Sequence, residues 1–430
     1  MIEEREHGEP ARSSLLPPRF SFMTKPRLPP TVTGLAAVSG LNDAASEMVY
    51  PLLPAFIVGT LGGSAATLGA LDGASDLAAS LLRFISGKYA DQRTKRGPLV
   101  LFGYGLAIAV RPIIALAQSA GVVIGLRVVD RIGKGLRSPA RDAMISDAVD
   151  ASMRGRAFGF QRAFDHGGAV VGGLLAWGLV QFVGLVPRQV IGWSVVPGVL
   201  ALVLLAGTLK AARQRENLKS AAATGPSVSI DQSPITNHHP PITNHHPPVF
   251  WLPVISLILV LITRLPETLL LLHLQRGGVA LALVPLAWAA LHVVRGAISY
   301  PAGRLVDLIG ERGVVALSGT LGALTSFAYS RAATPVLLVL AFLSIGLVSA
   351  ISEPAERTLV ARLAPKGAGR AFGEAQALQG LGALGAGLAF GALVDARGSA
   401  WALLISAAAT VLATALWLVV MPKKAMGDDR

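Results

Sequence analysis

The pentapeptide Gly155-Arg156-Ala157-Phe158-Gly159 returns 214 residues later as Gly369-Arg370-Ala371-Phe372-Gly373. Two further stretches repeat in the same way: RSPAR at 137–141 is echoed by SEPAE at 352–356, and GKYAD at 87–91 by GRLVD at 303–307. These two offsets, 215 and 216 residues, nearly equal the first. Three matches at almost one offset indicate that the chain is a duplication whose two halves fold alike, an organisation typical of membrane transporters.

Apolar segments of about 20 residues, the length that a bilayer demands, recur through both halves. Only 15% of the 430 residues are charged and 52% are hydrophobic, whereas soluble domains carry about 25% charged residues. The expected spans are 32–58, 65–88, 98–118, 120–146, 156–182, 187–209, 250–274, 279–303, 312–331, 334–360, 368–393 and 399–420. The predicted fold class is therefore an all-α membrane protein with twelve transmembrane helices in two pseudo-symmetric six-helix bundles.

Lysine and arginine residues concentrate in one set of loops, at 93–96, 154–156, 210–219, 304–312 and 362–370, whereas the opposite loops at 59–65 and 118–121 contain none. The positive-inside rule then places both termini in the cytoplasm. We expect a disordered cytoplasmic tail (1–30), an N-terminal bundle (31–209), a cytoplasmic linker (210–249), a C-terminal bundle (250–420) and a second cytoplasmic tail (421–430).

The expected linker contains the heptapeptide Pro-Ile-Thr-Asn-His-His-Pro twice, at 234–240 and 241–247. Its histidines are candidate metal ligands, but a duplicated stretch in a tolerant linker is the simpler explanation, and we predict no metal site. The net charge of +13 lies at the ends of apolar segments, so nucleic acid is not an expected partner. The chain has no phosphate-binding loop or catalytic motif, and neither a cofactor nor an enzymatic activity is predicted.

Two stretches, Gly87-x-x-x-Asp91 with Arg93 and Gly303-x-x-x-Asp307 with Arg312, resemble the loop signature of the major facilitator superfamily. The resemblance extends from Thr31 to about Val420. It implies two bundles that rock about a central site, in contact with the lipid bilayer and a small-molecule substrate. The stretches 41–48 and 130–139 are similar to a bacterial branch described as efflux or multidrug transporters.

In this signature, Gly87 is expected to let its helix pack closely against a neighbour. Asp91 is expected to face the positive N-terminal end of the helix near Gly369. These contacts would close the cytoplasmic side. Alternatively, the charges only set the orientation of the chain in the membrane. The predicted cytoplasmic gate consists of Gly87, Asp91, Arg93, Arg156, Gly303, Asp307, Arg312 and Arg370.

Charged residues inside the expected spans need a partner or a hydrated cavity, because each costs at least about 2.5 kcal/mol near the bilayer centre. Asp43 and Glu47 are four residues apart and share one helical face, and paired acids in a poorly hydrated cavity are typical proton carriers. We predict that these two acids, with His166, couple transport to protons. Alternatively, the acids neutralise the segment 120–146, and His166 is simply hydrogen-bonded.

The segment 120–146 carries a basic stripe formed by Arg127, Arg131, Lys134 and Arg141, which must face the protein interior rather than lipid. Arg264 and Glu267 are predicted to pair with each other around Pro266. The predicted cavity residues are Asn42, Arg127, Asp130, Arg131, Lys134, Gln161, Arg162, Asp165, Arg264, Glu267, His292, Glu353, Glu356, Gln376 and Gln379.

Taken together, these features predict a monomeric secondary active transporter of a bacterial inner membrane. It would export a small amphiphilic or drug-like solute in exchange for protons by alternating access, with the direction implied by the family resemblance. The basic stripe also fits uptake or exchange of an organic anion. A membrane receptor or sensor that binds a solute without moving it is a further alternative.

Overall fold

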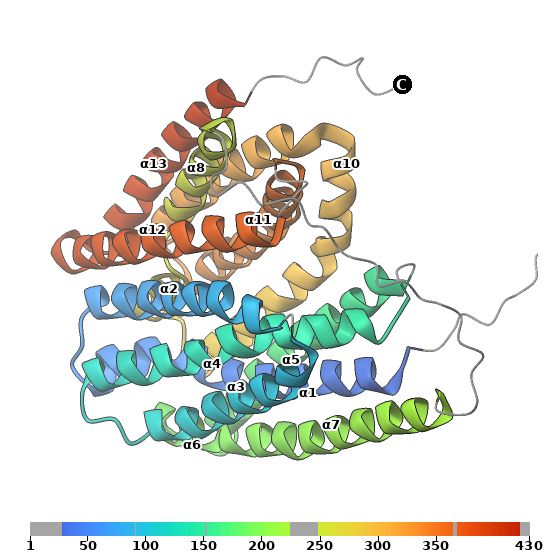
Figure 1. Cartoon of the computed structure of the whole chain (residues 1–430). Helices are drawn as coiled ribbons and strands as arrows, with labels where there is room; N and C mark the ends of the chain where they lie inside the picture. The colour runs from blue at the N-terminus through green and yellow to red at the C-terminus, as the bar shows by residue number, and fades with distance from the viewer. Residues whose placement is uncertain (1–27, 91, 151–152, 224–247, 364–367, 422–430) are drawn as a thin grey trace, which may run out of the picture.

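The computed structural model describes residues 28–90, 92–150, 153–223, 248–363 and 368–421 (Figure 1). The N-terminal half contains α1 (Pro30–Val49), α2 (Ala65–Ala90), α3 (Arg93–Ile114), α4 (Ala120–Asp147), α5 (Arg154–Gln181), α6 (Pro187–Trp193) and α7 (Val195–Ala223). The C-terminal half contains α8 (Pro248–Ile262), α9 (Glu267–Arg276), α10 (Leu283–Arg331), α11 (Pro335–Leu363), α12 (Ala368–Arg397) and α13 (Ser399–Val420). In Figure 1 the first half, blue to green, lies below the second, yellow to red.

These elements form twelve membrane-length segments within the described residues. The pairs α6–α7 and α8–α9 each make one span, and the short turns η1 (Tyr50–Leu52) and η2 (Ala55–Thr60) extend α1. Helix α10 contains two spans, because Gly310 takes a φ of 69° and interrupts the helix. By length and hydropathy alone, eight of the described helices qualify to cross a membrane. The more polar α1, α2 and α4 do not reach the hydropathy required, and α10 is counted as one helix although it contains two spans. The predicted twelve-helix fold is confirmed.

The break between α8 and α9 lies in the middle of the predicted membrane span. It comprises residues 263–266, and Pro266 caps the start of α9. Irregular backbone at membrane depth is tolerated where it is buried in protein or lines a cavity. Here the freed carbonyl of Thr263 accepts a hydrogen bond from Ser406 Oγ at 2.7 Å. The break therefore holds Arg264 on irregular backbone inside the bundle.

The two halves meet along α2 and α12 on one side and along α5 and α10 on the other. A Cβ atom added at Gly69 would lie 1.8 Å from the carbonyl oxygen of Gly387, so α2 and α12 touch backbone to backbone. By contrast, a Cβ at Gly87 would meet nothing within 4 Å. The prediction that Gly87 provides close helix packing is wrong, because the close approach lies at the other end of α2.

One large apolar cluster joins the two halves at one end of the molecule. We call the end of the molecule near residues 30, 150 and 421 the terminal end, and the opposite end the distal end. At the distal end, Phe56 and Leu68 of the first half share a buried cluster with Leu269 and Leu338 of the second. The buried clusters near the terminal end each belong to one half. In the described part of the chain, the apolar seal between the halves therefore lies at the distal end.

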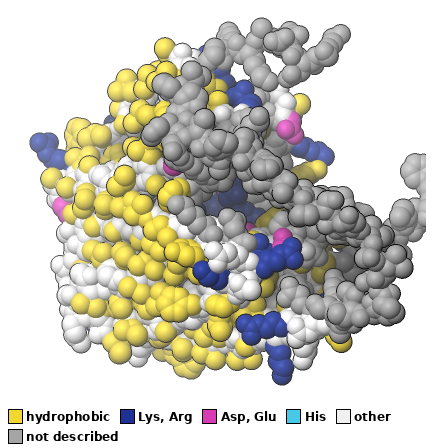
Figure 2. Space-filling view, in the orientation of Figure 1, with side chains coloured by type: hydrophobic (Ala, Val, Ile, Leu, Met, Phe, Trp, Pro, Cys, Tyr) yellow, Lys and Arg dark blue, Asp and Glu magenta, His cyan; other side chains and the backbone are white. Residues whose placement is uncertain are grey.

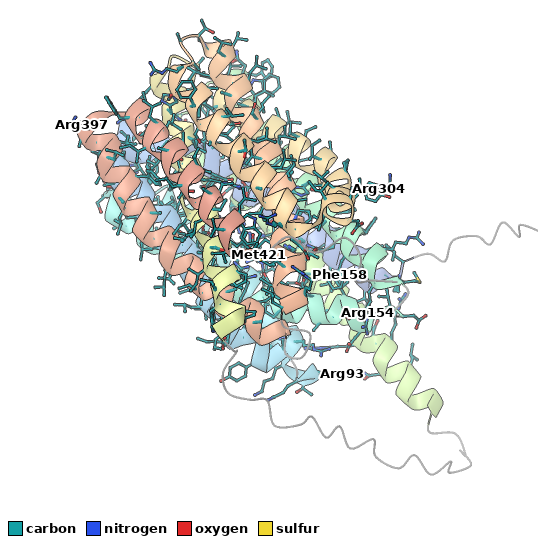
Figure 3. The ribbon with its side chains drawn as sticks, turned by 90° about the horizontal axis from the view of Figure 1, so that it is seen from above. Arg93, Arg154, Phe158, Arg304, Arg397 and Met421 are labelled. Carbon is teal, nitrogen blue, oxygen red and sulfur yellow. The ribbon has the colours of Figure 1, made fainter. Side chains whose placement is uncertain are left out.

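Basic residues mark the terminal end. Most of the Lys and Arg side chains visible in Figure 2 gather there, at the right of the view. Arg93, Arg154 and Arg304 lie toward this end in Figure 3, whereas Arg397 lies at the other. The distribution matches the loop asymmetry found in the sequence.

The predicted linker at 210–249 begins within a helix, because α7 continues to Ala223. The stretch 210–223 is rich in Ala, Arg and Lys, which are strong helix formers. The tandem heptapeptides lie outside the described residues, as do residues 1–27 and 422–430 of the predicted tails.

Candidate functional site

A cavity of about 410 Å³ lies between the two halves, within the usual range for small-molecule sites. Helices of both halves contribute to its wall, including α1, α2 and α4 from the first and α10, α11 and α12 from the second. The break between α8 and α9 also reaches it through Arg264, Leu265 and Pro266. Figure 2 shows basic side chains in the recess between the halves. A site shared in this way changes shape whenever the halves move against each other.

The basic stripe of α4 forms part of this wall. Arg127, Arg131 and Lys134 all line the cavity, because their spacing places them on one helical face. They stand opposite Arg264 and Arg295 of the second half, which line the same space. The structure thus brings together four basic residues that were predicted to line the cavity, Arg127, Arg131, Lys134 and Arg264.

Asp130, also predicted to line the cavity, is instead enclosed within the first half. Arg111 Nε lies 3.0 Å and Arg127 Nη1 3.1 Å from its two carboxylate oxygens. Arg111 also donates to the backbone carbonyl of Asn42 at 3.0 Å. All three charged side chains are at most 2% exposed. This buried ionic cluster fixes α3 and α4 together and leaves Asp130 no access to a solute.

The predicted coupling acids separate into two environments. Glu47 lines the cavity and accepts a hydrogen bond at 2.9 Å from the indole nitrogen of Trp288 in the other half. Asp43 is not among the cavity-lining residues and accepts a bond from Asn42 Nδ2 at 3.2 Å. Asn42 is itself buried. Both acids lie in the regular part of α1 and share a face, but they differ by one turn in depth along the helix, and only Glu47 reaches the cavity.

A second carboxylate ties the halves together. Asp72 of α2 accepts hydrogen bonds from Tyr50 Oη at 2.9 Å and from the Thr268 hydroxyl of α9 at 2.7 Å. The backbone N–H of Thr268 adds a third bond at 3.1 Å. A carboxylate at the first turn of a helix is stabilised by the helix dipole. Asp76, one turn away on α2, also lines the cavity.

The predicted pair between Arg264 and Glu267 is wrong. Glu267 instead forms an ion pair with Arg295 of α10, and Arg264 donates to the hydroxyls of Ser352 at 3.0 Å and Ser318 at 3.5 Å. The physical reason is the break at Pro266, since residues on opposite sides of it no longer share a helical face. Both Arg264 and Glu267 line the cavity as predicted.

Two histidines face each other across the halves. His166 of α5 and His292 of α10 have ring centroids 6.0 Å apart. His292 lines the cavity, and both of its ring nitrogens are buried without a hydrogen-bond partner among the described residues. His166 is not among the lining residues, so its predicted role in proton coupling has no direct route through the cavity wall.

Several predicted cavity residues lie instead between the cavity and the terminal end. Gln161 donates to Asp165 at 2.5 Å within the first half. Arg162 pairs with Glu353 across the halves, and Arg83 donates to Gln376 at 2.9 Å, also across the halves. Glu356 is not among the lining residues, whereas Gln379 is. The sequence identified the polar helices correctly but could not give the depth of each residue.

The predicted gate residues are only partly described. Asp91 and the side chain of Arg370 lie outside the described residues. Arg93 pairs with Asp147 at 3.2 Å, and Arg312 donates to the carbonyl of Leu418 at 2.7 Å, each within one half. Gly303 resembles Gly87, since a Cβ atom added at either position would meet nothing within 4 Å.

Sequence reasoning missed the aromatic part of the wall. Tyr50 and Trp288 line the cavity with ring centroids 5.0 Å apart, one from each half. Tyr50 is three residues after Glu47 and thus on nearly the same face, a signal that was available. Trp288 had no such signal, since its neighbours in the sequence are apolar.

Comparison with known proteins gives a single family. The model of the Major Facilitator Superfamily matches residues 35–299 and 270–429. An uncharacterized MFS-type transporter of Methanocaldococcus jannaschii is 34% identical over 172 residues, which span 40% of this chain and 42% of that protein. An uncharacterized protein of Mycobacterium tuberculosis is 27% identical over 85% of both chains. The multidrug resistance protein MdtH of Cronobacter sakazakii is 30% identical over 31% of this chain and 33% of its own.

Solved structures agree on the fold. A bacterial homologue of the human lysosomal transporter Spinster, in an inward-facing conformation, has a TM-score of 0.68 at 15% identity and covers 91% of this chain and 96% of its own. A D-xylose–proton symporter has a TM-score of 0.67 at 17% identity, covering 91% and 98%. The protein is thus a multi-pass membrane transporter and not an enzyme, and it belongs to the Major Facilitator Superfamily.

Proposed function

We propose that this protein is a proton-coupled secondary transporter that exports a small amphiphilic solute by alternating access. It would act as a monomer in a bacterial inner membrane, with both termini in the cytoplasm. The loop asymmetry in Lys and Arg supports this orientation. Export is supported by the similarity to MdtH, a multidrug resistance protein, and by the resemblance found in the sequence.

The arrangement of the halves supports alternating access. The distal end is held by a shared apolar cluster, whereas polar pairs bridge the halves on the terminal side, including Arg162–Glu353 and Arg83–Gln376. Arg162 and Glu353 are 42% and 41% exposed, and exposed ion pairs contribute about 1 kcal/mol at most. The terminal side is therefore the easier one to open from this state.

The observation that carries the proposal is the hydrogen bond between Glu47 and Trp288. It joins a cavity-lining carboxylate of the first half to an indole of the second at 2.9 Å. A hydrogen bond to an ionised acceptor is roughly twice as strong as a neutral one. A proton on Glu47 would thus weaken a contact that holds the distal end closed, which links protonation to the change of access.

Proton movement in proteoliposomes tests this function. A pH-sensitive dye inside the vesicles would report the internal pH when cationic, neutral and anionic compounds are added. We expect a compound-dependent pH change in the wild type that is lost in Glu47→Gln. Glu311→Gln is the matched control. Glu311 forms an ion pair with Arg362 at 2.9 Å and is not among the cavity-lining residues.

Asp43→Asn is the informative companion variant. Since Asp43 is not a cavity-lining residue, we expect it to retain coupling if Glu47 alone carries the proton. Full coupling in the Asp43→Asn/Glu47→Gln double variant would overturn the proposal. Counterflow of a labelled compound separates transport from binding alone, since a receptor that does not transport gives none.

A further inference from the structure

The cavity wall contains more positive charge than its carboxylates neutralise. Five basic side chains line it, those of Arg127, Arg131, Lys134, Arg264 and Arg295. Arg127 pairs with Asp130 and Arg295 with Glu267. For the other three, the described residues offer no carboxylate at ion-pair distance. A charge removed from water without a partner is costly, so these three cations need an explanation.

Arg264 is the clearest case. Its bonds go to the hydroxyls of Ser352 and Ser318, which are neutral, and its Nε is buried with no partner in the described chain. The break between α8 and α9 holds it at the cavity rather than along a helix surface. A guanidinium presents its donors in a planar fork that matches carboxylate, sulfonate and phosphate groups.

Arg131 and Lys134 occupy the opposite wall. The Nε of Arg131 is likewise buried and without a partner among the described residues. Asp76 lines the cavity within electrostatic range of both cations, yet it forms no ion pair with either. One carboxylate also cannot neutralise these two cations together with Arg264.

The remaining acids of the wall are already engaged. Glu47 is bound by Trp288, and Asp72 by Tyr50 and Thr268. If either turned toward Arg131, a contact between the two halves would be lost. Both acids keep their negative charge in these hydrogen bonds, so the wall, as far as the described residues form it, has five basic and four acidic side chains, a formal excess of one positive charge.

Beside the cations lies an apolar wall. Tyr50 and Trp288 are in ring contact at 5.0 Å, and Leu270 and Ile345 line the same space. His292 packs edge-on to Trp288, also at 5.0 Å, with both ring nitrogens unsatisfied among the described residues. The cavity thus offers an aromatic surface next to positive charge.

We infer that the transported solute is a small organic anion with an aromatic or aliphatic body. Its carboxylate, sulfonate or phosphate group would lie between Arg264 of the second half and Arg131 and Lys134 of the first. This inference rests on the proposed function and names its substrate class. An anion held by both halves also draws them together, which favours closure of the cavity around a loaded site.

Calorimetric titration of the purified protein in a neutral detergent tests the inference with three matched probes. These are 2-naphthoate, 2-naphthalenemethanol and 2-naphthylmethylammonium, which share one aromatic body and differ in charge. We expect 2-naphthoate to bind at least about tenfold more tightly than either of the others, since hydrogen bonds between charged groups are stronger than those between neutral ones.

Variants then locate the site. Arg264→Gln is expected to weaken 2-naphthoate binding about tenfold or more, and Arg264→Lys to restore part of it. Arg331→Gln, at the exposed distal end of α10, is the matched control and should bind as the wild type does. If Arg264→Gln does not fold, Arg131→Gln makes the same test from the other half.

Equal binding of the three probes, or failure of 2-naphthoate to bind, would overturn the inference. Because binding is measured at equilibrium without a membrane, the result is independent of transport. Proteoliposomes that move the alcohol or the ammonium compound but not 2-naphthoate would leave the transporter proposal intact and refute the anionic substrate. Binding of 2-naphthoate without transport of any probe would support the anionic ligand and refute the transporter proposal.

Discussion

Asp395, near the end of α12, accepts a hydrogen bond at 2.8 Å from the backbone N–H of Ala65, the first residue of α2. Its second carboxylate oxygen accepts one from the N–H of Ala66 at 2.9 Å. An acid of the second half thus caps a helix of the first at the distal end. Asp72 makes the reciprocal contact with the start of α9, so each half supplies one carboxylate to a helix N-terminus of the other.

Replacing Asp395 with Ala should loosen the distal end. A carboxylate at a helix N-terminus contributes about 0.3–1 kcal/mol, so we expect the distal-open population to rise about two- to fivefold. The chain has no cysteine, and a single Ser349→Cys in the cavity wall can therefore report access of a membrane-impermeant thiol reagent from the distal face. Asp150→Ala, at the terminal end, should leave the labelling rate unchanged. Faster labelling in both variants, or in neither, would contradict this role of Asp395.

The buried cluster around Asp130 should dominate the stability of the first half. Asp130→Asn leaves the guanidinium groups of Arg111 and Arg127 buried beside each other without a counter-charge. We expect a loss of about 3–5 kcal/mol in the free energy of unfolding, measured by reversible unfolding in mixed micelles.

Asp147→Asn is the matched control for this variant. Asp147 also faces two arginines, at 2.6 Å and 3.2 Å, but is 35% exposed. Exposed pairs contribute about 1 kcal/mol or less, so this variant should lose no more than that. Similar losses in the two variants would show that burial does not set the cost.

Gly69 and Gly87 lie on one helix and should differ sharply in their tolerance of a methyl group. Gly69→Ala would place a Cβ 1.8 Å from the Gly387 carbonyl and force α2 away from α12. Overpacking of this kind costs about 1–3 kcal/mol, so we expect a lower melting temperature and slower transport. Gly87→Ala meets open space and should match the wild type on both measurements. The opposite ranking would mean that the halves do not touch along this seam.

The ion pair between Arg162 and Glu353 should act as a weak latch on the terminal side. Reversal of either charge alone is expected to raise labelling of the Ser349→Cys reporter from the terminal face by at most about fivefold, since the pair is largely exposed. The double swap Arg162→Glu/Glu353→Arg should restore part of the wild-type rate, because Arg357, which lies 2.9 Å from Glu353, would repel an arginine at that position. If the reporter in the double swap were labelled as fast as in the single variants, the two residues would not act as a pair.

The fold was predictable because its signals are long and redundant. Hydropathy, the basic loops and the internal repeat each point to the same twelve spans, even where Pro139 or Pro354 lies inside a helix. The break at Gly310 was also marked by a glycine between two apolar runs. The stretch 210–223 extends α7 beyond the predicted membrane span, and its residues favour a helix.

The site was predictable only in part, because it depends on how each helix is rotated against its neighbours. The stripe of α4 was found correctly, since Arg127 and Arg131 could not face lipid. The partner of Asp130 could not be found, because Arg111 belongs to another helix and no spacing relates the two. The pairing of Glu267 failed for a local reason, as Pro266 ends the periodicity on which the prediction relied.

The glycine contact between α2 and α12 has a consequence for how a solute reaches the cavity from the lipid phase. A seam in which two backbones touch, as at Gly69 and Gly387, has no gap through which a hydrophobic molecule can pass sideways. Near the terminal end, the seam beside α5 is held by the exposed pair of Arg162 and Glu353. If the proposed function holds, an amphiphile dissolved in the bilayer would thus enter along the seam beside α5 rather than the seam between α2 and α12. Its charged group would meet Arg162 and Glu353 first.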